Sequence, residues 1–181
     1  MAHHAQTFFV SAVRNEFPAN FTGVKVLEVG SYDVNGSVRP FFADCDYTGL
    51  DVVPGPGVDV VCEAQKYAGF EGTFHTVISC ECFEHNPEWI ATFANMVRLV
   101  KSPGLIIMTC ATTGRAKHGA IGDSGANYLN ADPRYYDCEY YYRNLTEADF
   151  KQAFDLDALF SYYRFEVNQT SCDLYFVGVR R

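Results

Sequence analysis

The sequence has few features that would place the chain in a membrane, in a secretory route or on nucleic acid. No apolar run is long enough to span a bilayer. Residues 1–9 lack the basic region and long apolar stretch of a secretory signal. Lys and Arg number 14 against 22 Asp and Glu, a net charge of −8, whereas nucleic-acid-binding proteins usually carry a basic face. We therefore expect a cytoplasmic protein with no membrane association and a small-molecule partner; nucleic acid is unfavoured, and the oligomeric state is not indicated.

Cysteine pairs of the CxxC type are also missing. The seven cysteines are odd in number, and four of them (Cys62, Cys80, Cys110 and Cys172) lie in or beside apolar runs. A free thiol in such a run behaves as a small hydrophobic group. Without a secretory signal, this pattern favours reduced thiols over a disulfide framework.

The pattern that is present is an alternation of short apolar runs and helical segments. The 181 residues, 48% of them hydrophobic, suit one domain with one sizeable core. Runs rich in Val and Ile are typical of buried parallel strands, and they cover residues 25–31, 47–53, 58–62, 74–80 and 104–110. Helical patterns cover residues 5–16, 87–101 and 146–154.

The end of the chain has a different pattern. Residues 160–167 and 173–179 are strand-like and are joined by the polar segment 168–171, which predicts an antiparallel hairpin. The alternating part before it predicts a parallel, doubly wound sheet.

In an open α/β sheet, ligands bind beyond the carboxyl ends of the strands. The first strand ends near Gly30, but Tyr32 stands where a dinucleotide-binding GxGxxG motif has its second glycine. Glu28 precedes this turn, and an acid suits an ammonium or sulfonium group better than a phosphate. Asp51 ends the second strand, where a carboxylate can accept hydrogen bonds from ribose hydroxyls.

Two further strand ends carry polar residues. Glu63 and Ala64 follow the third strand and are expected to contact an adenine edge. The fourth strand ends in the segment 79–85, which contains two cysteines, two glutamates and His85. Its spacing lacks the paired clusters of a tetrahedral zinc site, so no metal is expected. Cys80 and Cys82 are expected to face the same way, into packing.

Taken together, these segments resemble the class I S-adenosylmethionine-dependent methyltransferases of the methyltransferase type 11 kind, over about residues 24–155. The matching pieces are residues 26–30, 47–51, 54–59, 77–79 followed by 83–85, and 97–104. The resemblance implies an α/β, Rossmann-like fold of one domain over 1–181. Its seven-stranded, mostly parallel sheet has the order 3-2-1-4-5-7-6, with strand 7 antiparallel and helices on both faces.

The resemblance also implies S-adenosylmethionine as the cofactor. The residues that it places around the methionine, ribose and adenine parts are Glu28, Gly30, Ser31, Asp51, Val52, Glu63, Ala64, Ser79 and Cys80. In this family a second glycine is common where this chain has Tyr32.

The segment at about 111–144 is predicted to form a lid on the substrate side, because long loops in compact domains are usually functional. His118 lies in it and resembles a His-Gly motif of related sequences, and Tyr142 and Arg143 partly match an aromatic–Arg segment. We expect Tyr142 and Arg143 to bind the acceptor; alternatively, the tyrosines only pack and Arg143 pairs with a structural carboxylate.

Methyl transfer from a sulfonium is an in-line displacement, in which alignment of the reactants can contribute about 7–11 kcal/mol. A general base is needed for a poor nucleophile such as a hydroxyl, and we expect a hydroxyl on a small molecule or sugar. His118 is the first candidate for that base and His85 the second. Two alternatives stay open: a non-catalytic S-adenosylmethionine-binding domain, and a nicotinamide-dependent oxidoreductase, against which Tyr32 argues.

Overall fold

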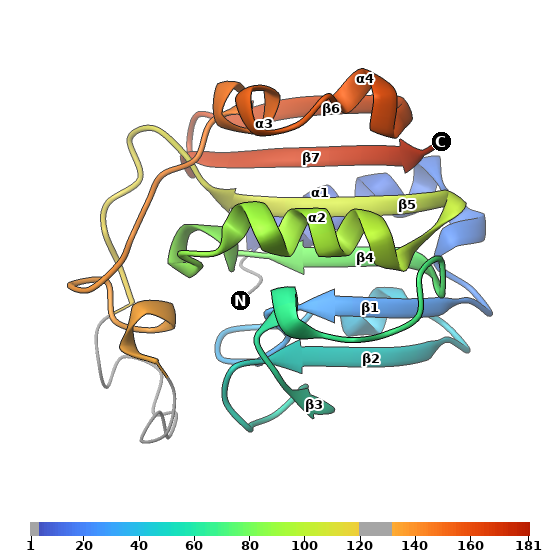
Figure 1. The fold of residues 1–181 in the computed structure, drawn as a ribbon, viewed down its shortest axis with the longest axis horizontal. Helices are drawn as coiled ribbons and strands as arrows, with labels where there is room; N and C mark the ends of the chain where they lie inside the picture. Colours follow the sequence, from blue (N-terminus) through green and yellow to red (C-terminus); the bar gives the residue numbers. More distant parts are fainter. Residues whose placement is uncertain (1–3, 120–131) are drawn as a thin grey trace.

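The computed structural model of the chain describes residues 4–119 and 132–181. They form a seven-stranded sheet with the order β3-β2-β1-β4-β5-β7-β6 (Figure 1). The strands are β1 (Lys25–Val29), β2 (Asp46–Asp51), β3 (Val60–Val61), β4 (Phe74–Cys80), β5 (Val100–Ala111), β6 (Phe160–Asn168) and β7 (Asp173–Arg180). Strands β1 to β5 pair in parallel, and β7 is antiparallel to both β5 and β6. The predicted Rossmann-like topology, including its terminal hairpin, is confirmed.

Helices cover both faces of the sheet, with α1 behind it and α2 in front in Figure 1. The α-helices are α1 (His4–Glu16), α2 (Trp89–Leu99), α3 (Glu147–Ala153) and α4 (Leu156–Leu159). The first three lie within the predicted helical segments or extend them by one residue, whereas the four-residue α4 was not predicted. Among the described residues, no helix is both long enough and apolar enough to cross a membrane.

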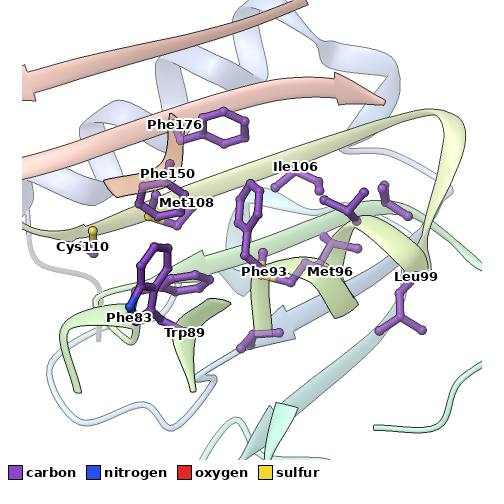
Figure 2. Close-up of a cluster of buried hydrophobic side chains, with 14 of the residues drawn as sticks. Phe83, Trp89, Phe93, Met96, Leu99, Ile106, Met108, Cys110, Phe150 and Phe176 are labelled. Carbon is purple, nitrogen blue, oxygen red and sulfur yellow. The ribbon is translucent and has the colours of Figure 1, made fainter. Parts of the chain in front are cut away.

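An aromatic cluster fills the face that α2 covers (Figure 2). Phe93 of α2 is fully buried and lies between Phe150 of α3 and Phe176 of β7, with ring centroids 5.2 and 5.5 Å away. Phe83 joins the same cluster, 6.2 Å from Phe150. Because Phe83 opens the short 3-10 turn Phe83–His85 after β4, this packing holds the end of β4 in place. The core on this face therefore fixes the position of a predicted site segment.

The opposite face is packed by α1. Its buried Phe9 stacks on Tyr175 with ring centroids 4.3 Å apart, and Cys80 belongs to the same cluster. Cys82 instead packs against the cluster on the α2 face. The expectation that Cys80 and Cys82 face the same way is wrong, because β4 ends at Cys80 and Glu81 has a positive φ of 52° that breaks the strand alternation.

One connection and one strand differ from the doubly wound pattern of buried strands and helices that the sequence predicts. Between β1 and β2, the structure describes every residue and contains only the 3-10 turn Arg39–Phe41, with Pro40 inside it, in place of an α-helix. The third strand is two residues long and lies at the edge of the sheet, where Val60 and Val61 are 36% and 54% exposed. The prediction that this strand is buried is therefore wrong.

Candidate active site

A cavity of about 460 Å³ opens at the carboxyl ends of β1, β2 and β4. One end is lined by Gly30 and Asp51, and the other by His85 and His118. We call these the Gly30–Asp51 end and the His85–His118 end. This is the place where open α/β sheets bind ligands.

Gly30 permits the turn that begins the cavity. Its φ of +77° lies in the region that favours glycine, and a Cβ atom there would lie 2.6 Å from Cys82 Cβ. The backbone N–H groups of Gly30 and Ser31 both donate to the carbonyl of Leu50, at 2.9 Å. The turn is thus fixed by backbone bonds to β2 and by contact with the segment that follows β4.

Tyr32 fits this turn without closing the cavity. Its ring lies over Gly55, where a Cβ atom would come within 1.9 Å of Tyr32 Cε2. The Tyr32 backbone N–H donates to Asp51 Oδ2 at 3.1 Å. The side chain is accommodated by a glycine of the next loop, and the main chain orders the carboxylate.

Asp51 ends β2 and lines the cavity. Its two oxygens accept backbone N–H groups of Tyr32 and Val53, and the second of these distances is 3.4 Å. Burial raises the pKa of Asp51, and these N–H groups partly oppose that shift. An ionised carboxylate has about four acceptor positions, so Asp51 can accept further hydrogen bonds. Val52 and Ala64 line the cavity beside it.

Glu63 is not among the lining residues. Its Oε1 pairs with Lys66 Nζ at 2.6 Å, and its Oε2 accepts the hydroxyl of Tyr135 at 3.0 Å. Tyr135 itself lines the cavity. Glu63 therefore positions a tyrosine of the predicted lid segment.

The structure does not bring Glu28, Ser31, Ser79 or Cys80 to the cavity lining. Glu28 follows strand alternation to the α1 face, where it accepts the hydroxyl of Tyr47 at 2.8 Å, and burial raises its pKa to about 7. Ser79 donates to the carbonyl of Val29, and the Ser31 side chain is buried. The family resemblance places these four residues near the cofactor, with Ser79 and Cys80 contributing backbone groups; in the structure, strand alternation and the turn direct their side chains into the core.

At the other end, Glu84, His85 and His118 lie together. Glu84 Oε1 is 4.0 Å from His85 Nε2 and 3.8 Å from His118 Nε2, and the two imidazole rings meet edge to face at 4.9 Å. Burial lowers the pKa of His85 to about 3 and also lowers that of His118. Both imidazoles are therefore neutral near pH 7.

His118 is held in one orientation. Its Nδ1 lies 3.0 Å from the carbonyl of Ala116, which can only accept, so Nδ1 carries the hydrogen and Nε2 keeps its lone pair. The Tyr142 hydroxyl lies 3.1 Å from the same Nδ1. Tyr142 thus supports His118 from behind and is not a lining residue.

Arg143 lies away from the cavity. Its guanidinium pairs with Asp149 and lies 5.9 Å from the centre of the Trp89 ring. Asp149 also accepts the backbone N–H and hydroxyl of Thr146 in the capping box that begins α3. The structure therefore shows the alternative expectation, in which Arg143 pairs with a structural carboxylate. Of the predicted lid segment, residues 120–131 lie outside the described residues.

Sequence reasoning missed several lining residues, among them Glu81 and Arg115. Glu81 is 5% exposed, and its Oε1 accepts the hydroxyl of Thr109 at 3.0 Å. Arg115 pairs with the buried Asp173 at 3.1 Å. The position of Glu81 directly after a strand was a usable signal, whereas no motif marks Arg115.

Comparison with known proteins finds a fold and no family. No protein-family model and no curated protein matches the chain. Among solved structures, it is similar to Haemonchus contortus phosphoethanolamine N-methyltransferase 2 in complex with S-adenosyl-L-methionine (TM-score 0.63, 15% identity, 98% of this chain and 52% of that one). It is also similar to Burkholderia thailandensis 1,6-didemethyltoxoflavin-N1-methyltransferase with bound S-adenosylhomocysteine (TM-score 0.59, 13% identity, 99% of this chain and 92% of that one). A third similar structure is that of the CurJ carbon methyltransferase (TM-score 0.63, 13% identity, 96% of this chain and 53% of that one).

These identities show the fold alone, and it is the Rossmann-like fold of S-adenosylmethionine-dependent methyltransferases. The chain spans about half the length of the Haemonchus and CurJ proteins. The narrower type 11 resemblance is not confirmed, because no family model matches.

Proposed function

We propose that the chain is an S-adenosylmethionine-dependent methyltransferase that methylates a hydroxyl of a small molecule or sugar. The observation that carries the proposal is the cavity itself. It connects a glycine turn and a strand-end carboxylate, Gly30 and Asp51, with two neutral imidazoles, His85 and His118. Similarity in fold to methyltransferases with different acceptors supports the class of reaction.

The Gly30–Asp51 end fits this cofactor better than a dinucleotide. Asp51 has acceptor capacity for ribose hydroxyls, and Val52 and Ala64 offer apolar and backbone contacts to adenine. In the sequence, Tyr32 stands where a dinucleotide site has the glycine that permits close backbone approach of a pyrophosphate. When bound, S-adenosylmethionine supplies a methyl group activated by a sulfonium.

The His85–His118 end is proposed to bind and activate the acceptor. In the reaction, a bond forms between the acceptor oxygen and the methyl carbon while the carbon–sulfur bond breaks and its electron pair stays on sulfur. The hydroxyl proton must be removed, and neutral His118 with its lone pair on Nε2 is the simplest base. His85, whose pKa burial lowers to about 3, is the weaker base of the two.

A ligand screen by thermal unfolding tests the proposal. A ligand at about 100 times its dissociation constant adds about 2.7 kcal/mol to the free energy of unfolding. We expect S-adenosylhomocysteine to raise the melting temperature and NAD to leave it unchanged. A response to NAD alone would favour the oxidoreductase alternative, and no response to either would contradict the proposal.

A second screen separates an enzyme from a binding module. Radiolabelled methyl transfer is measured against hydroxyl-bearing small molecules and sugars, with amine analogues as a comparison. We expect transfer to a hydroxyl acceptor. Binding of S-adenosylhomocysteine without transfer to any acceptor would favour the non-catalytic alternative.

A further inference from the structure

We propose that Glu84, His85 and His118 bind a divalent first-row transition-metal ion, with Zn²⁺ or Mn²⁺ as the natural candidates. One ligand atom from each residue, a carboxylate oxygen or an imidazole nitrogen, lies within 4.8 Å of the other two. Two histidines and one carboxylate form the ligand set of His₂Glu zinc sites and of 2-His-1-carboxylate sites. The proposal departs from the sequence-based expectation of no metal, because the third ligand comes from a distant segment.

Glu84 supplies the second, independent observation. Its side chain is fully buried, and among the described residues neither carboxylate oxygen has a hydrogen-bond partner. The backbone N–H groups of Glu84 and Ala111 favour its ionised form, but neither has hydrogen-bonding geometry to an oxygen. Buried polar groups are almost always paired. The unpartnered carboxylate therefore points to a missing cationic ligand.

The spacing suits an ion rather than direct hydrogen bonds. The separations of 3.8 and 4.0 Å between Glu84 Oε1 and the two Nε2 atoms are too long for hydrogen bonds. An ion bound at about 2.0–2.2 Å from each ligand places two ligand atoms at most about 4.4 Å apart. Both separations fall below that limit, so an ion can lie between Glu84 and each of the two imidazoles.

The surroundings of His118 match those of a metal ligand. Metal-bound histidines usually donate their other ring N–H to a carbonyl or carboxylate, which fixes the tautomer. His118 Nδ1 is directed at the Ala116 carbonyl at 3.0 Å, so the lone pair of Nε2 faces Glu84. The Nε2 atom of His118, which could act as a base, is therefore also oriented to bind an ion.

The local charge also favours a cation. Glu81 Oε2 is buried without a hydrogen-bond donor among the described residues. Arg115 pairs with Asp173, and within residues 4–119 and 132–181 no Lys or Arg side chain pairs with Glu81 or Glu84. A divalent ion would compensate this excess of buried acid.

The ion would lie at the His85–His118 end, beside lining residues that face the cavity. Three protein ligands would leave coordination positions for water or a substrate oxygen, and a hydroxyl bound there would lose its proton to solvent water more readily. This consequence rests on the proposed function. It also replaces the free-base role of His118, because one lone pair on Nε2 cannot both bind an ion and accept a proton.

Isothermal titration of the untagged, chelator-treated chain with Zn²⁺ and Mn²⁺ tests the proposal. We expect one equivalent to bind, with affinity reduced at least about tenfold in Glu84→Gln and in His118→Asn, since even residues supporting metal ligands typically change affinity 10–100-fold. His75→Asn is the matched control, because His75 contacts Lys101 at a different place on the sheet. Circular dichroism and melting of each variant establish that it is folded.

Co²⁺ spectra separate this site from the seven free cysteines, none of which is a proposed ligand. We expect a spectrum of nitrogen and oxygen ligands that disappears in Glu84→Gln. A thiolate charge-transfer band, equal binding by Glu84→Gln and the unmodified chain, or no binding at all would overturn the proposal.

Binding of S-adenosylhomocysteine is measured on the same samples. If the chain binds S-adenosylhomocysteine but no metal, the metal site is wrong and the proposed function stands. If it binds metal at this site but no S-adenosylhomocysteine, the proposed function is wrong and the metal site stands.

Discussion

At the Gly30–Asp51 end of the cavity, backbone hydrogen bonds fix the geometry, whereas at the His85–His118 end a fully buried carboxylate lies beside two imidazoles and has no hydrogen-bond partner among the described residues. Asp51 accepts two backbone N–H groups, and Gly30 is tied to Leu50. Glu84, by contrast, is fully buried with both oxygens unpartnered among the described residues. The Gly30–Asp51 end is preorganised without a ligand, whereas the His85–His118 end has an unpartnered carboxylate that a bound cation would complete.

This difference indicates that the Gly30–Asp51 end determines cofactor affinity and the His85–His118 end the reaction. An end whose geometry is fixed by main-chain hydrogen bonds is already arranged to bind a cofactor, and many different side chains are compatible with that main-chain geometry. A buried carboxylate without a hydrogen-bond partner is costly in stability, and such unsatisfied groups concentrate where function requires them. Variants at the two ends should therefore respond differently, and four changes test that expectation.

The largest effect is expected from Phe83→Ala. Phe83 is fully buried and anchors the turn that carries Glu84 and His85. Removal of a buried phenylalanine side chain typically costs about 3–5 kcal/mol. Chemical denaturation should show this loss, and metal binding should weaken with it. Phe70→Ala is the control, because Phe70 is 88% exposed; equal stability of the two variants would contradict the anchoring role.

Gly30→Ala should break the other end. A positive φ costs an alanine about 1–2 kcal/mol, and crowding against Cys82 adds the cost of overpacking, about 1–3 kcal/mol. Gly72→Ala is the matched control, since Gly72 has a φ of +63° and nothing within 4 Å of the added Cβ atom. The difference in unfolding free energy between the two variants measures the contact with Cys82. Equal unfolding free energies of the two variants would show that the contact with Cys82 does not restrict a Cβ atom at position 30.

Glu84→Gln should change the pH dependence of stability. Burial raises the pKa of Glu84 from 4.5 to about 7, so the stability associated with it is full below about pH 4.5 and is lost as the pH rises to about 7. Glutamine stays neutral and removes that decline. In metal-free buffer at pH 8, the variant should be more stable than the unmodified chain by about 1–3 kcal/mol.

Glu28→Gln serves as the comparison for this experiment. Burial also raises the pKa of Glu28 to about 7, but this residue lies on the α1 face with a hydrogen bond from Tyr47. The Glu28→Gln variant should flatten the pH dependence of the free energy of unfolding and leave metal binding unchanged. A pH profile of Glu84→Gln identical to that of the unmodified chain would contradict the buried, ionisable state of Glu84.

The smallest effect is expected from Arg143→Ala. The guanidinium is half exposed and pairs with Asp149, and such pairs contribute about 0–1 kcal/mol. Stability should fall by less than that limit, and the KM for an acceptor should stay the same. A KM raised several-fold would restore the substrate-binding role that the sequence pattern predicts.

The sequence predicts that Gly30 and Asp51 lie close together, because each follows from a local pattern. A strand followed by a glycine turn, and a second strand followed by an acid, are patterns within short segments, and parallel strands bring such ends together. Glu28 shows the limit of this reasoning: its neighbourhood in sequence suggested the ligand, but strand alternation turns it toward Tyr47. The edge position of Val60 and Val61 likewise follows from topology, which hydrophobicity alone does not reveal.

The His85–His118 end could be predicted only in part. Sequence reasoning named both histidines, but it judged Glu84 and His85 by the spacing within one segment. Their partner comes from the connection after β5, and that contact depends on how two loops meet in space. No local pattern encodes the missing hydrogen-bond donors of a buried carboxylate, which became visible only once the packing around Glu84 was known.

The central claim is that Asp51 holds the cofactor at the ends of the parallel strands. Calorimetric titration with S-adenosylhomocysteine tests it most directly, on the unmodified chain, on Asp51→Ala and on Asp46→Ala. Asp46 is the matched control, because it lies at the opposite end of the same strand in an exposed pair with Lys25. We expect binding by the unmodified chain and by Asp46→Ala, and none by Asp51→Ala. Equal binding by all three proteins would contradict it.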